Sequence, residues 1–160
     1  MQFILIFVWI ALAATFIRRY CAYQATELVG VIQRKYSYLV AVVVVFPVIL
    51  MATFRELSFG DSNTYANTFI NMPGTADYFA TIITTYRKDI GYYVLVNLLK
   101  QLFGNNYELY FFVIALFQGC AVAYLFHKYS GKYCFSVFLF IASTDYISWM
   151  YNGFRQFTAV

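Results

Sequence analysis

The sequence predicts an all-α fold, a polytopic transmembrane helical bundle with an extracytoplasmic loop that contains interfacial or re-entrant helices. Of its 160 residues, 62% are hydrophobic and only 11% are charged, whereas soluble domains usually carry about a quarter charged residues. Long apolar runs also recur along the chain, separated by short basic segments. We therefore expect residues 1–160 to be the N-terminal part of one multi-spanning membrane domain, truncated relative to a longer protein.

Four apolar runs are expected to cross the bilayer. At about 1.5 Å of rise per residue, such runs cover most of a hydrocarbon core of about 30 Å. They are residues 3–17, 38–54, 107–126 and 133–150, and a fifth helix is expected to start near residue 154. The pair Arg18-Arg19 follows the first run. A cleaved signal peptide carries its positive charge ahead of the apolar core, so a retained helix is favoured over that alternative.

The charges also predict the topology. Short basic loops stay in the cytoplasm, and both the segment after residue 17 and the segment after residue 126 are basic. The loop 55–106 is therefore expected on the extracytoplasmic side of the membrane. In it, apolar residues at three- and four-residue steps over 78–86 predict an amphipathic surface helix. Residues 92–103 span only about 18 Å as a helix, too little to cross.

The composition excludes several classes of function. The net charge is +4, but no basic run is long enough to suggest nucleic-acid binding. The three cysteines match no metal or redox spacing, and His127 lies at a span end, where an interface role is expected. No metal site or cofactor is assigned from these residues, and the need for one stays open. No hydrolase or kinase motif is present either.

Arg55 directly follows the second apolar run and is a candidate phosphate-binding residue. A guanidinium is permanently charged and can donate to two phosphate oxygens at once. The competing interpretation is an interfacial anchor, which the local sequence favours because arginines at helix ends commonly extend to headgroups.

Asp61 is a candidate general base, and Tyr65 follows it by one helical turn. A carboxylate there can take a proton from an attacking sugar hydroxyl, and a helix would set both side chains on one face. The alternative, which the local sequence favours, is that Asp61 caps a helix N-terminus.

Two charged residues near the C-terminal end are harder to explain by structure alone. Arg155 opens a new apolar helix at the end where the helix dipole disfavours a cation, so an anionic partner is expected. Asp145 lies inside the fourth apolar run. An acid inside a span suggests a functional site. Its candidate partners are Arg155 and Lys100, and a structural role is an equal alternative.

Taken together, these features resemble the EpsG-like family of exopolysaccharide polymerases, which is similar in role to the Wzy O-antigen polymerases. The resemblance is carried by the basic segment after the first span and by four motifs spread over essentially all 160 residues. The motifs are Arg55 with Gly60-Asp61 and Tyr65, Asp89-Ile90-Gly91-Tyr92, Leu95-Val96-Asn97-Leu98-Leu99, and Asn152-Gly153-Phe154-Arg155-Gln156-Phe157-Thr158-Ala159. The chain departs at Asp89, where a Glu is expected.

The resemblance implies a membrane glycosyltransferase that joins undecaprenyl-pyrophosphate-linked oligosaccharide repeats outside the membrane, in exopolysaccharide or capsule biosynthesis. The lipid bilayer and other polysaccharide-export machinery are the implied partners, and the fragment alone is expected to be inactive. By motif position, Arg55 and Arg155 hold the leaving pyrophosphate and Asp61 is the base. Substrate contacts are assigned to Tyr65, Tyr92, Asn152, Gln156 and Asp145. The alternatives are a flippase or transporter for the same lipid-linked glycan and a non-catalytic membrane scaffold.

Overall fold

The computed structural model describes residues 2–21, 36–86 and 88–143, which form helices joined by turns and short extended segments, with no strand among them. The predicted all-α fold class is therefore confirmed. In chain order the elements are α1 (Gln2–Phe16), the π-helical segment η1 (Ile17–Cys21), α2 (Tyr38–Thr53), α3 (Ser62–Asn71), α4 (Tyr78–Thr85), α5 (Ile90–Phe103), α6 (Tyr107–Tyr129) and α7 (Tyr133–Ala142).

Among the described helices, α6 alone is long and apolar enough to cross a membrane, with 23 residues. The helices α2, α5 and α7 are apolar but shorter. The described part of the run expected over 133–150 is helical from Tyr133 to Ala142, and Ser143 is extended. The rest of that run lies outside the described residues. The fifth helix expected near residue 154 lies outside the described residues.

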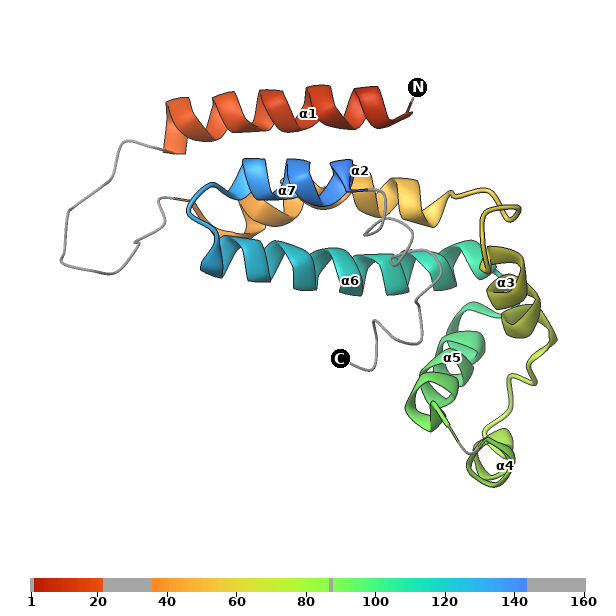
Figure 1. The fold of residues 1–160 in the computed structure, drawn as a ribbon. Coiled ribbons are helices and arrows are strands. Elements are labelled where there is room, and N and C mark those ends of the chain that lie inside the picture. Colours follow the sequence, from red (N-terminus) through yellow and green to blue (C-terminus); the bar gives the residue numbers. More distant parts are fainter. Residues whose placement is uncertain (1, 22–35, 87, 144–160) are drawn as a thin grey trace. The chain divides into compact units, whose positions relative to one another are not determined.

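The described chain divides into two compact units, of which the first contains residues 2–51 and 119–143. In it, α1 packs along α7, as Figure 1 shows, with the rings of Phe7 and Phe138 centred 5.2 Å apart. The Tyr133 hydroxyl of α7 donates to the Ala41 carbonyl of α2 at 2.6 Å. The hydroxyl of this buried tyrosine thus joins α7 to α2 by a hydrogen bond.

In this unit, α2 and α6 pack tightly against each other at Gly119. A Cβ at position 119 would lie 2.5 Å from Cγ1 of Ile49, a distance that real Cβ atoms do not show. In a membrane the hydrophobic effect does not drive helices together, so their association depends on close packing. Small residues let two helix backbones approach closely. Glycine is therefore required here by packing.

The second unit contains residues 52–118 of the described chain. In Figure 1, α3 and α4 both lie beside α5, and these contacts define the unit. Its core joins α3, α5 and the first turns of α6, with the buried residues Tyr65, Ala66, Phe69, Met72, Tyr92, Val96, Leu99, Tyr110, Phe111 and Ile114. The loop predicted from the sequence is therefore a packed helical subdomain.

The sequence interpretation of this loop counted two short helices, and the structure contains three. The additional helix is α3, whose buried residues Ser62, Tyr65, Ala66 and Phe69 follow a three- and four-residue period. That period is the signature of an amphipathic helix. The surface helix predicted over 78–86 is present as α4, with Ile82 buried and Ile83 62% exposed.

Two polar side chains of α5 hold the turn between α3 and α4. Asn97 donates to the Pro73 carbonyl at 2.7 Å, and the Lys100 ammonium donates to the Ile70 carbonyl at 2.7 Å. Gly74 lies against the stem of Lys100, where a Cβ would be 3.3 Å from Cγ. We refer to Asn97 and Lys100 as the α5 clamp, which fixes the C-terminal end of α3.

Candidate functional site

Arg55 follows α2 and is buried in the second unit, with 9% of its surface exposed. Its guanidinium carbon lies 4.1 Å from the ring centroid of Phe111, which is fully buried in α6. This geometry is a cation–π interaction, which strengthens as the cation loses water. The side chain is packed against a ring, whereas an anchor that extends to headgroups would be exposed at its tip.

Asp61 occupies the N-cap position of α3 and is exposed. Its side chain forms no capping hydrogen bond, so the bond that the capping interpretation requires is not made. The next residue, Ser62, is fully buried, and its hydroxyl has no hydrogen-bond partner among the described residues. The start of α3 thus presents an exposed carboxylate beside backbone N–H groups of a helix N-terminus, a position that favours anions.

Tyr65 and Tyr92, assigned to substrate contact from the sequence, both lie in the core of this unit. They are 7% and 8% exposed, and their rings meet edge to face with centroids 6.4 Å apart. The Tyr92 hydroxyl shares a 2.5 Å hydrogen bond with that of Tyr110, and the Tyr110 ring stacks on Phe69 at 4.6 Å. Asp61 and Tyr65 share a backbone hydrogen bond at 3.0 Å, but one side chain is exposed and the other is buried.

The remaining predicted site residues lie outside the described residues. They are Arg155, Asn152, Gln156 and Asp145. The pairing of Arg155 with Arg55 therefore stays a prediction, as does the partner of Asp145.

Lys100 is the second buried cation of this unit, at 7% exposed. Burial lowers the pKa of its ammonium group. The nitrogen donates to the Ile70 carbonyl and to Asn105 Oδ1, and lies 5.2 Å from the centroid of Phe69. These contacts stabilise the turn, so Lys100 supports the site from within the core.

The sequence interpretation missed Gln118, in the middle of α6. Its amide is fully buried, and neither its nitrogen nor its oxygen has a hydrogen-bond partner among the described residues. A buried amide without a partner costs about 1–3 kcal/mol. The sequence did contain a signal for this site, because Gln118 is an uncharged polar residue within an apolar run of 20 residues.

The described residues contain no group of three His, Cys, Asp or Glu side chains that could hold a metal ion. What they do contain is a permanently charged guanidinium held rigidly against a ring, and an exposed carboxylate six residues later at a helix N-terminus. Such groups can bind an anion and accept a proton.

Comparison with known protein families gives one match that covers most of the chain. The model of the EpsG family matches residues 38–160, a range that includes Arg55 and Asp61. The searches of curated proteins and of solved structures found no match. The family is associated with a membrane-bound, polysaccharide-polymerase type of role. The chain belongs to the EpsG family.

Proposed function

We propose that this chain is part of a membrane polymerase that joins lipid-linked polysaccharide repeat units. The observation that carries the proposal is the family match over residues 38–160. Within that range, the buried cation Arg55 precedes the exposed acid Asp61 by six residues. The substrate class that fits a cation and a carboxylate is a glycan linked to a lipid pyrophosphate, such as undecaprenyl pyrophosphate.

The proposed reaction is a glycosyl transfer. A sugar hydroxyl oxygen of one repeat unit bonds to the anomeric carbon of the growing chain, and the bond from that carbon to the pyrophosphate oxygen breaks. The electron pair leaves with the pyrophosphate, whose charge Arg55 and Arg155 stabilise. The hydroxyl proton passes to the Asp61 carboxylate. Asn152, Gln156 and Asp145 are proposed substrate contacts.

The contact with Phe111 supports this role by fixing where the charge lies. The ring holds the guanidinium carbon at 4.1 Å, and charge that is fixed in place lowers the cost of reorganisation during reaction. All three guanidinium nitrogens are buried, so phosphate reaches them only when this packing opens. Tyr65 and Tyr92, as core residues, are proposed to position α3 and α5 rather than to touch sugar.

We further propose that the chain is a multi-pass inner-membrane protein with the segment 55–106 on the outer face. The positive-inside rule supports this orientation. The 14 residues of α5 reach only about 21 Å, which supports an interfacial position rather than a crossing. A lipid-linked oligosaccharide, the bilayer and other export machinery are the proposed partners.

The test uses Arg55→Lys and Arg155→Lys in a strain that lacks the native gene, with glycan chain length measured by gel electrophoresis. A lysine keeps the charge but loses the two-pronged donor geometry. We expect either variant to shift the product from long chains to single repeat units displayed outside the cell. Arg18→Lys, at an exposed position of η1, should leave chain length unchanged.

Unchanged chain length in both variants would reject the role of these arginines. Single units trapped on the inner leaflet, rather than displayed outside, would point to a flippase instead.

The role of Asp61 has a matched control in Asp77. Both residues are exposed, both occupy the N-cap of a short helix in the same unit, and neither forms a side-chain capping bond. We expect Asp61→Asn to shorten the glycan by more than tenfold in mean length, because an amide cannot accept the hydroxyl proton. Asp77→Asn should not. Equal effects of the two substitutions would mean that Asp61 acts on helix stability alone.

A further inference from the structure

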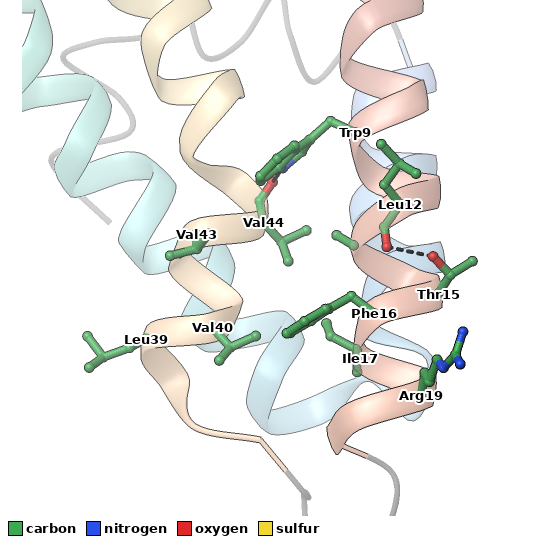
Figure 2. A pocket seen from close by; sticks show the side chains of 11 residues that line it. Trp9, Leu12, Thr15, Phe16, Ile17, Arg19, Leu39, Val40, Val43 and Val44 are labelled. Atoms are coloured by element: carbon green, nitrogen blue, oxygen red, sulfur yellow. Dashed lines mark hydrogen bonds between the residues drawn. The ribbon is translucent and has the colours of Figure 1, made fainter.

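A groove between α1 and α2 in the first unit has no role in the proposed reaction. Its volume is about 720 Å³, within the range of about 300–1,000 Å³ typical of ligand sites. Figure 2 shows its side chains, which come from α1, η1 and the first half of α2. In this view Trp9 and Phe16 extend toward α2, whereas Thr15 and Arg19 extend from the other side of the helix. The lining residues are Trp9, Leu12, Ala13, Thr15, Phe16, Ile17, Arg19, Leu39, Val40, Val43 and Val44.

Polar groups are placed at the two ends of this groove. At one end the Trp9 indole nitrogen donates to the Val44 carbonyl at 3.2 Å, which joins the two helices. Arg19 lies at the opposite end, as Figure 2 shows. Between them, the one hydroxyl on the wall, that of Thr15, already donates to the Leu12 carbonyl at 2.7 Å. The middle of the groove therefore offers an apolar ligand no competing polar group.

The groove has the length of one bilayer leaflet. Ten residues separate Trp9 from Arg19, and at about 1.5 Å per residue they span about 15 Å, half of a hydrocarbon core of about 30 Å. Its walls remain open to lipid, since Leu12 is 60% exposed and Val43 is 55% exposed. A cation at the leaflet boundary with an apolar channel running inward is complementary to an anionic headgroup and its acyl chain.

We propose that the groove between α1 and α2 binds one acyl chain of an anionic phospholipid, whose phosphate is held at Arg19. The arginine end faces the cytoplasmic leaflet by the positive-inside rule, where anionic lipids attract basic segments next to a span. Arg18 is adjacent in η1 and carries the same charge but does not line the groove.

Trp9 provides a direct test, because it lines the groove at the end away from Arg19. In a Trp149→Phe background, Trp9 is the sole tryptophan of the chain. The protein is placed in vesicles of equal phosphatidylglycerol and phosphatidylcholine, with bromines deep in the acyl chains of one lipid or the other. The two vesicle preparations then have the same lipid composition and differ only in which lipid carries the bromines. The ratio of Trp9 quenching in the two preparations reports which lipid occupies the groove.

We expect brominated phosphatidylglycerol to quench Trp9 with about fivefold preference. Arg19→Gln should abolish the preference, whereas Arg19→Lys and the matched Arg18→Gln should retain it. Val43→Phe, which fills the groove, should reduce quenching by both lipids, and Leu125→Phe at an exposed position of α6 should not.

Three results would overturn the proposal. Equal quenching by both lipids would mean ordinary lipid contact without headgroup selection. No quenching by either lipid would mean that another part of the protein covers the groove. Relief of phosphatidylglycerol quenching by a small amount of polyprenyl phosphate would assign the groove to the substrate tail instead. None of these readouts depends on polymerase activity.

Discussion

The guanidinium of Arg55 and the ring of Phe111 form the contact on which the candidate site is built. The guanidinium carbon lies 4.1 Å from the ring centroid, and Phe111 is fully buried. The ring belongs to α6, the described helix that could cross a membrane. The contact therefore ties a charge at the end of α2 to a rigid element, which is the arrangement that a preorganised anion site needs.

Phe111→Leu is expected to impair the proposed reaction beyond its effect on stability. Leucine keeps the site apolar but removes the ring face that holds Arg55, a contact worth about 0.5–2 kcal/mol. We expect mean glycan chain length to fall several-fold in a complemented deletion strain.

The matched control is Phe69→Leu. Phe69 is an equally buried phenylalanine of the same core, and it stacks on Tyr110. Both variants should lower the melting temperature to a similar degree, and Phe69→Leu should leave chain length near normal. Parallel losses of chain length in the two variants would show that Phe111 acts through the core alone.

Much of the fold could be predicted from the sequence because the helix period is local. The apolar character predicted the helical class, and the spacing over residues 78–86 predicted α4. Only the N-terminal end of α3 was anticipated, as a cap at Asp61, and the extent of the helix was not. Its buried face includes Ser62 and Ala66, which hydropathy counts weakly, although their spacing with Tyr65 and Phe69 is helical.

The environment of the site residues could not be predicted from the sequence. Exposure depends on contacts between segments far apart in the chain, such as Arg55 with Phe111 and Tyr92 with Tyr110. The sequence of an apolar helix that contains a tyrosine is the same whether the tyrosine hydroxyl contacts a sugar or another tyrosine. Residue types alone therefore nominated Tyr65 and Tyr92 for substrate contact, whereas the structure buries both.

Lys100→Met is expected to destabilise the second unit. The ammonium of the buried Lys100 donates to the Ile70 carbonyl at 2.7 Å and to Oδ1 of the exposed Asn105. Methionine keeps the apolar stem but leaves these acceptors without their donor, at a cost of about 1–3 kcal/mol. The melting temperature in detergent should fall by several degrees.

The control for this clamp is Lys88→Met, which removes an exposed lysine from the same unit. It should leave the melting temperature unchanged. A Lys100→Met protein as stable as the wild type would show that the clamp contributes nothing to the fold.

Gly119→Ala is expected to separate α2 from α6. The new Cβ would lie 2.5 Å from Cγ1 and 2.6 Å from Cδ1 of Ile49, which is fully buried and has little room to move. Overpacking of this kind costs about 1–3 kcal/mol. The melting temperature should fall accordingly.

A double-mutant cycle tests the cause directly. Ile49→Ala removes the atoms that collide with the new Cβ, so Gly119→Ala should cost less in the Ile49→Ala background than in the wild type. Gly131→Ala, where nothing lies within 4 Å of the added Cβ, is the comparison for any general effect of alanine. Additive losses in the cycle would exclude the contact as the reason for glycine at 119.

Gln118→Leu is expected to raise the melting temperature, in contrast to the other core substitutions. The amide is fully buried in α6 with no hydrogen-bond partner among the described residues. Replacing it with an apolar side chain of similar size removes a desolvation cost of about 1–3 kcal/mol.

Gln101→Leu is the control, because the amide of Gln101 is exposed and donates to Asn97 at 2.7 Å. That variant should show no gain, and a lower melting temperature for Gln118→Leu would mean that its amide is paired in the folded protein. A gain in stability combined with shorter glycan chains would instead indicate that the buried amide is kept for function, since stability is commonly given up at functional sites.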